Sequence, residues 1–208
     1  ELQTSSNVTS GGAVISTNGF KTTGWLPATV PCTVLACLVQ NQVYTNLFKD
    51  KNLESVPTEQ FDVPWWYRTT FEAPTSADDS TATVLTFKGV NYRANVWVNG
   101  KLVASEKTMV GTFRYFRVDI SQQLQPSNVL AVEVFRPIDL SLPPNNNSTD
   151  LAISFVDWAP SPPDSNMGLW REVQLSTHAH KLALHSLQIA TQLANSPPLP
   201  PAAAAAAA

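Results

Sequence analysis

The sequence predicts an all-β protein, an antiparallel sandwich or jelly roll with one short helix. From Trp65 onward, short segments of alternating apolar and polar residues recur at regular spacing. Turn signals separate these segments, and only one stretch of the chain has a convincing helical pattern. Many short strands joined by turns, with little helix, are typical of an antiparallel β-sandwich.

The expected elements follow one another along the chain. Residues 1–24 are rich in Ser, Thr, Asn and Gly, and we expect a loose lead-in with room for one strand at 13–15. The short helix is expected at 32–40, directly after Pro31. Strands are expected at 65–71, 83–87, 94–98, 113–120, 129–135, 169–175 and 182–189. Asn99-Gly100 supplies the positive φ angles of a two-residue type I′ hairpin.

Length and composition limit both the architecture and the partners. The chain has 208 residues, and we expect one domain at 25–190 followed by a Pro- and Ala-rich tail or linker at 191–208. Charged residues make up 14%, against about 25% in an average soluble protein, and the formal net charge is −3. We therefore expect neither a nucleic-acid partner nor, because the longest apolar run of the body is only 34–39, a membrane span.

The two cysteines, Cys32 and Cys37, both fall within the expected helix. Five helical steps rise about 7.5 Å, whereas a disulfide allows roughly 7 Å between Cα atoms. Two buried free thiols are therefore expected, and these say little about the compartment.

Glycosylation and metal binding have only weak sequence signals. Asn-x-Ser/Thr sequons occur at Asn7, Asn146 and Asn147, and they permit a secreted or extracellular protein, although chance supplies about as many. The histidines at 178, 180 and 185 have no Cys, Asp or Glu nearby in sequence, so we expect no metal site. We expect no cofactor, because a phosphate-binding glycine loop is absent from the sequence.

Four motifs follow one another along the chain: Trp-Leu-Pro-Ala with Pro-Cys-Thr-Val-Leu-Ala (25–36), Val-Pro-Trp-Trp-Tyr-Arg (63–68), Phe-Lys-Gly-Val-Asn-Tyr-Arg-Ala-Asn-Val-Trp-Val-Asn-Gly (87–100) and the run from Asp-Trp-Ala-Pro to Gly-Leu-Trp-Arg-Glu-Val (157–173). Together they resemble the N-terminal sugar-binding domain of glycoside hydrolase family 2, especially its exo-β-D-glucosaminidase branch, which is related to the β-mannosidases. Four ordered motifs are more specific than any one short pattern, and the resemblance covers roughly residues 20–190.

The resemblance implies a galactose-binding-like jelly roll placed ahead of an immunoglobulin-like domain and a TIM barrel. In that family both catalytic glutamates belong to the barrel, so we expect no catalytic residue in this chain. The implied partners are a carbohydrate, either a β-linked amino sugar or a mannoside, and the downstream domains or an assembly partner. The alternative function is a stand-alone structural or carbohydrate-binding module of an extracellular assembly, without hydrolase activity.

The resemblance also implies sugar contacts in one loop. β-Mannosidases have a Trp-Asp-Trp-Gly-Pro segment at the positions of 156–160, so Asp157 would bond sugar hydroxyls and Trp158 would cover an apolar sugar face. Val and Ala replace the first Trp and the Gly of that pattern, which favours the glucosaminidase branch. Asp164 and Asn166 follow as further candidate contacts, since a carboxylate suits an amino sugar. The alternative is a Pro-stiffened loop that packs against a neighbouring domain.

Overall fold

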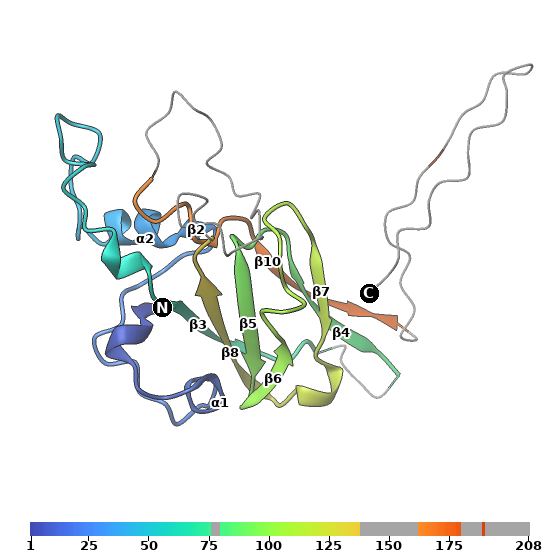
Figure 1. The fold of residues 1–208 in the computed structure, drawn as a ribbon. Coiled ribbons are helices and arrows are strands. Elements are labelled where there is room, and N and C mark those ends of the chain that lie inside the picture. Colours follow the sequence, from blue (N-terminus) through green and yellow to red (C-terminus); the bar gives the residue numbers. More distant parts are fainter. Residues whose placement is uncertain (76–79, 138–161, 180–188, 190–208) are drawn as a thin grey trace, which may run out of the picture.

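A computed structural model describes residues 1–75, 80–137, 162–179 and 189, and its strands form two antiparallel sheets that face each other across one core (Figure 1). The larger sheet has the strand order β1-β3-β8-β5-β6, the smaller sheet has the order β10-β4-β7, and β2 and β9 form a separate ribbon. The strands are β1 (Leu2–Thr4), β2 (Cys32–Thr33), β3 (Trp65–Glu72), β4 (Ala82–Phe87), β5 (Arg93–Val98), β6 (Lys101–Ala104), β7 (Phe116–Asp119), β8 (Ser127–Phe135), β9 (Gly168–Leu169) and β10 (Val173–His178). The helices are α1 (Gly12–Ile15), α2 (Val34–Gln40) and the 3-10 turns η1 (Ser5–Asn7), η2 (Glu59–Phe61) and η3 (Ser121–Gln123). The predicted all-β sandwich is confirmed.

Alternation along the strands produces the core. Tyr67 of β3 lies opposite Val132 of β8, which in turn lies opposite Val96 of β5, and all three side chains are buried between the sheets. Leu85 and Phe87 of β4 close the core from the smaller sheet. Because successive residues of a strand face opposite sides, β3, β4, β5 and β8 each turn one of their two faces to this core.

The expected hairpin is present between β5 and β6. Asn99 and Gly100 have φ angles of 49° and 84°, and Val98 pairs with Lys101 across the turn. Positive φ at both central residues is the defining feature of the type I′ turn, whose twist matches that of the flanking strands. This prediction is confirmed.

The N-terminal residues contribute more regular structure than the sequence indicates. β1 pairs with β3, and residues 13–15, where a strand had room, instead lie in a one-turn helix, α1. Ile15 packs with Trp66 and Ala131 on the outer face of the five-stranded sheet, and Trp97 lies against this cluster. The expectation of one helix is therefore wrong. Residues 12–15 form a helical turn because this turn packs Ile15 on the apolar outer face of the sheet.

Two expected strands differ clearly in their bounds, and a third cannot be compared. The strand expected at 113–120 is confined to β7, and the strand expected at 169–175 is divided into β9 and β10. Of the strand expected at 182–189, only Ile189 belongs to the described residues, and the tail at 191–208 lies outside them. No helix in the described part of the chain is long and apolar enough to cross a membrane.

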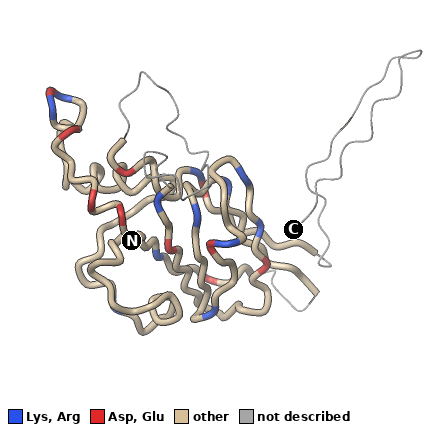
Figure 2. The backbone as a smooth tube through the Cα atoms, in the orientation of Figure 1, with Lys and Arg blue, Asp and Glu red and all other residues tan. Residues whose placement is uncertain are grey.

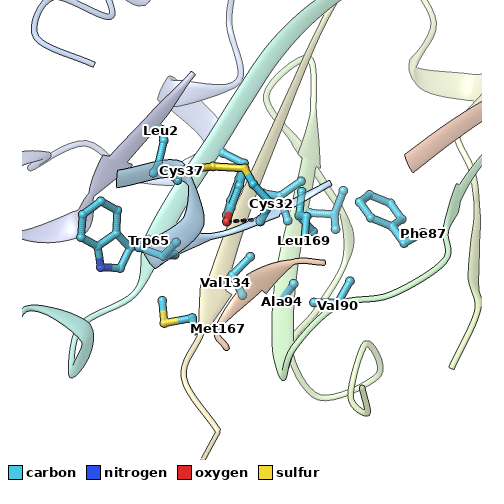
Figure 3. Close-up of a cluster of buried hydrophobic side chains, with 14 of the residues drawn as sticks. Leu2, Cys32, Cys37, Trp65, Phe87, Val90, Ala94, Val134, Met167 and Leu169 are labelled. Atoms are coloured by element: carbon cyan, nitrogen blue, oxygen red, sulfur yellow. Dashed lines mark hydrogen bonds between the residues drawn. A yellow bond between two sulfur atoms is a disulfide. The ribbon is translucent and has the colours of Figure 1, made fainter. Parts of the chain in front are cut away.

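The cysteine prediction is wrong, because Cys32 and Cys37 form a disulfide with a Cα–Cα distance of 5.7 Å (Figure 3). Helix α2 begins only at Val34, after Thr33, whose hydroxyl accepts a hydrogen bond from the Ala36 N–H. Cys32 therefore lies in the extended β2, and the chain bends where it enters the helix. This bend brings Cys37 closer to Cys32. The Cα separation expected for five steps along a straight helix therefore does not apply.

Charged groups of both signs are interspersed along the described backbone (Figure 2). The described residues contain no group of three His, Cys, Asp or Glu side chains arranged to hold a metal ion.

Candidate functional site

The candidate sugar contacts lie in or beside the long connection between β8 and β9. Asp157 and Trp158 lie outside the described residues, as do the sequons at Asn146 and Asn147. Residues 162–169, which are described, lead from this connection into β9. The remaining sequon residue, Asn7, is exposed at the end of η1.

Asp164 is a buried residue with a role inside the fold. Its side chain is 0% exposed; Oδ2 accepts a hydrogen bond from the Leu35 N–H and Oδ1 accepts one from the Asn166 N–H, both 2.9 Å long. The first N–H groups of a helix have no partner within the helix, so this carboxylate satisfies a donor at the start of α2. The structure thus places Asp164 inside the fold as a link to α2 and does not bring its carboxylate to the surface of the described residues.

The surroundings of Asp164 set its protonation. Burial raises the pKa of this carboxyl above its ordinary value of 3.8, while hydrogen bonds from Leu35, Asn166 and the Thr33 side chain act in the opposite direction. An acid with a raised pKa in the folded state binds its proton more tightly there than in the unfolded chain. Its contribution to stability is therefore fully present below pH 3.8 and is lost as the pH rises through the raised value.

We therefore predict that Asp164→Asn changes the pH dependence of stability. Relative to the variant, the wild type should be more stable under mildly acidic conditions than at neutral pH, because only the wild type loses a stabilising proton as the pH rises. Thermal unfolding measured across this pH range tests the prediction. Asp50→Asn, at an exposed position in the 41–63 connection, is the control. A constant difference between wild type and Asp164→Asn at every pH would contradict it.

Asn91 is the central residue of this region, and the sequence reasoning did not single it out. Its side chain is buried; Nδ2 donates to the carbonyls of Ser165 (2.9 Å) and Asn166 (2.8 Å), and Oδ1 accepts from the Thr112 hydroxyl. Burying a side-chain amide without hydrogen-bond partners would lower stability. The three hydrogen bonds of Asn91 offset that cost. The available signal is the position of Asn91, directly after Val90 and within the conspicuous motif at 87–100.

Asn166 thus has a fixed backbone and a partly exposed side chain. Both Ser165 and Asn166 have positive φ angles, 51° and 55°. Their carbonyls turn inward to Asn91, which fixes the path of the chain between Asp164 and β9. Of the four sequence-predicted contacts, the structure places Asp164 and Asn166 next to each other and describes neither Asp157 nor Trp158.

β9 completes the attachment of this segment to the fold. The Val34 N–H donates to the Met167 carbonyl at 2.8 Å, and Cys32 pairs with Leu169 across the β2–β9 ribbon. The buried Tyr67 hydroxyl donates to the Cys32 carbonyl at 2.9 Å, and burial raises the pKa of Tyr67 well above its usual range. The hydroxyl therefore stays a neutral donor. Residues 164–169 are held to α2, to Asn91 and to the β2–β9 ribbon at once.

Two hollows accompany this region. A cavity of about 250 Å³ at the edge of the sandwich is walled largely by apolar side chains of both sheets, including Val132 and Leu175. A shallower hollow of about 470 Å³ contains the Lys88–Glu172 ion pair (2.6 Å) and the ring of Trp170, on which the Arg171 guanidinium stacks. The second exposes a Trp ring beside charged groups, a combination that suits a sugar.

Comparison with known proteins identifies the family. The model of the "Glycosyl hydrolase 2 galactose-binding domain-like" family matches residues 13–171. An exo-β-D-glucosaminidase of Amycolatopsis orientalis is 38% identical over 193 residues, which cover 92% of this chain and 17% of the relative. A mannosylglycoprotein endo-β-mannosidase of Lilium longiflorum is 32% identical over 171 residues, covering 74% of this chain and 17% of the relative.

Solved structures agree with this result. The crystal structure of the exo-chitosanase CsxA from Amycolatopsis orientalis matches with a TM-score of 0.74 and 37% identity, over 86% of this chain and 20% of that one. A β-D-mannosidase from Dictyoglomus thermophilum, at 22% identity and a TM-score of 0.61 over 75% of this chain and 21% of that one, shares the fold. The chain spans about a fifth of the length of these proteins. It belongs to the galactose-binding-like domain family of the family 2 glycoside hydrolases.

Proposed function

We propose that this chain is the non-catalytic sugar-binding and support domain of a family 2 glycoside hydrolase that resembles exo-β-D-glucosaminidases. The observation that carries the proposal is the 38% identity to an exo-β-D-glucosaminidase over 92% of this chain but only 17% of that enzyme. A glycosidase needs two carboxyl groups in one site. Asp164, the buried acid beside the candidate loop, instead bonds α2 and Asn166.

The proposed work of the domain is to hold one wall of an active site. Asp157 would bond the hydroxyls or the amino group of a β-linked sugar, and Trp158 would cover an apolar face of the ring. The sequence pattern supports both roles. Asn166 has a fixed backbone and a partly exposed side chain, which suits a further contact. Asp164 holds the residues that follow this loop in sequence to the start of α2.

The remaining partners and the compartment belong to the same proposal. The immunoglobulin-like and TIM-barrel domains of such enzymes would complete the active site. Secretion is supported by the Cys32–Cys37 disulfide, since disulfides persist mainly in oxidising compartments. The exposed position of Asn7 suits a glycosylated side chain.

Two assays test the proposal. The 208-residue chain should not hydrolyse p-nitrophenyl-β-D-glucosaminide, and turnover by this chain would contradict a non-catalytic role. In the native polypeptide that carries the domain, Asp157→Ala should raise KM for the same substrate about tenfold, equivalent to about 1.4 kcal/mol of binding free energy. Asp50→Asn is the control, and a KM unaffected by Asp157→Ala would remove the sugar contact from the proposal.

A free-standing glycan-binding module is the second candidate, and the exposed aromatic residues near the hollow favour it. Phe113 and Tyr115 are large exposed side chains, and Phe113 meets Trp170 edge to face with ring centroids 5.9 Å apart. Calorimetry of the 208-residue chain with chitosan oligomers tests this function. It predicts binding heat that Tyr115→Ala reduces and Leu102→Ala, at another exposed position, does not. Absence of heat with the wild-type chain rejects it.

A further inference from the structure

Arg136 connects three stretches of chain that are far apart in sequence. Its Nε donates to the Ser165 hydroxyl at 3.2 Å, and its Nη1 pairs with the carboxylate of Asp62. Arg136 directly follows β8, and Asp62 directly follows the 3-10 turn η2. One guanidinium therefore joins the end of a central strand, the approach to β9 and the end of the 41–63 connection.

The position of these contacts gives them a consequence for the proposed site. Arg136 precedes the connection that carries Asp157, and Ser165 follows it. A bond between Arg136 and Ser165 therefore fixes the distance between the two ends of that connection. The pairing with Asp62 ties the same point to the other long connection of the sequence.

Ser165 has further hydrogen bonds to its surroundings. Its N–H donates to the Pro162 carbonyl at 2.9 Å, and its own carbonyl accepts from the buried Asn91 side chain at 2.9 Å. The neighbouring Asp164 is bonded to the start of α2. A side chain attached to Ser165 is therefore attached to the core.

The chemistry of arginine suits this bridging role. Its planar guanidinium presents several N–H donors in a fixed fork, so that it can bind two acceptors in one geometry. A lysine ammonium is a single point charge on a flexible stem and does not reproduce that fork. The Arg136 side chain is 22% exposed and that of Asp62 is 61% exposed, so the ion pair alone contributes little to global stability.

We propose that Arg136 is a positioning residue, which fixes both ends of the connection carrying Asp157 and ties them to the 41–63 connection. Its effect on sugar binding rests on the proposed function, whereas its effect on the backbone at 165–167 does not. Because the ion pair is half exposed to solvent, its role is local. Removing the Arg136 guanidinium should loosen the backbone at 165–167 and leave the rest of the sandwich intact.

Amide hydrogen exchange of the 208-residue chain tests the local effect. Arg136→Gln should speed exchange at Ser165 and Met167, whose N–H groups bond Pro162 and Asp164, about tenfold or more. Arg136→Lys should give an intermediate effect, and Arg117→Gln, at an exposed position of β7, should give none. The melting temperature of every variant should stay close to that of the wild type. Unchanged exchange at both amides in Arg136→Gln would overturn the inference, whatever the sugar-binding result.

A double-mutant cycle in the native polypeptide connects the positioning role to Asp157. If Arg136 acts through that residue, Arg136→Gln raises KM several-fold alone and adds nothing in the Asp157→Ala background. Equal effects in both backgrounds would overturn a role exerted through Asp157. An absent Asp157→Ala effect together with faster exchange at Ser165 refutes the proposed sugar contact and supports the structural link made by Arg136.

Discussion

Replacing Gly168 with alanine should lower the free energy of unfolding by about 3 kcal/mol or more. The φ angle at Gly168 is +137°, a backbone conformation that L side chains rarely adopt. A Cβ there would lie 2.4 Å from the Tyr67 hydroxyl oxygen, 2.8 Å from the Thr33 Cα and 3.0 Å from the Val34 nitrogen. Two of these are backbone atoms at the start of α2, so relief requires β2 and β9 to separate. The substitution combines backbone strain with overpacking in a buried region.

Denaturant unfolding measures this effect, with Gly19→Ala as the matched control. A Cβ at Gly19 meets nothing within 4 Å, so the control should change stability by no more than about 0.5 kcal/mol. Tyr67→Phe gives a second check, because it removes the nearest clashing atom along with the hydrogen bond to the Cys32 carbonyl. Tyr67→Phe should therefore cost less in the Gly168→Ala background than alone. Equal destabilisation by Gly168→Ala and Gly19→Ala would refute the packing account.

Local pattern was enough to predict the central strands. Trp65 and Tyr67 of β3, and Val96 and Val98 of β5, lie two positions apart and face the main core. A register shifted by one residue would turn these side chains to the other face of the sheet. The hairpin at Asn99 follows from the backbone preference of two adjacent residues. Such features depend on neighbours in sequence, and they appear in the fold as expected.

The environment of residues 164–166 depends on distant contacts that no local pattern contains. The sequence predicts an available carboxylate at Asp164, whereas in the structure this carboxylate accepts a hydrogen bond from Leu35, 129 residues away in sequence. The same holds for Asn91, whose amide contacts residues 74 and 75 positions further along the chain. Which polar residue of a loop is buried is decided by the element that packs on it, and here that element is the start of α2.

The start of α2 itself had a signal in the sequence. Thr33 is of a residue type favoured at helix N-caps, and a helix starting after it leaves Cys32 outside. Placing the start at Cys32 produced the expectation of free thiols. A shift of two residues in a helix boundary thus changed the predicted chemistry of both cysteines.

Removing the Cys32–Cys37 disulfide should lower the free energy of unfolding by about 2 kcal/mol. The bridge spans five residues, and closing so short a loop removes about this much chain entropy from the unfolded state. Both side chains are buried in the main core beside Leu2 and Trp65 (Figure 3). The bridge joins β2 to the first turns of α2, and the Cys32 carbonyl also accepts the Tyr67 hydroxyl. Its loss should therefore loosen the same attachment that holds Asp164.

Two measurements separate the cross-link from the packing of the sulfur atoms. Reduction of the wild type keeps both side chains in the core and tests the cross-link alone, whereas Cys32→Ala with Cys37→Ala also removes their volume and should destabilise further. Denaturation with and without reductant gives the first difference, and the double variant, insensitive to reductant, is its control. Thiol labelling of the unfolded, unreduced chain tests the bond directly. Modification of both cysteines would show free thiols and remove the disulfide's support for secretion, whereas labelling only after reduction would confirm the bridge.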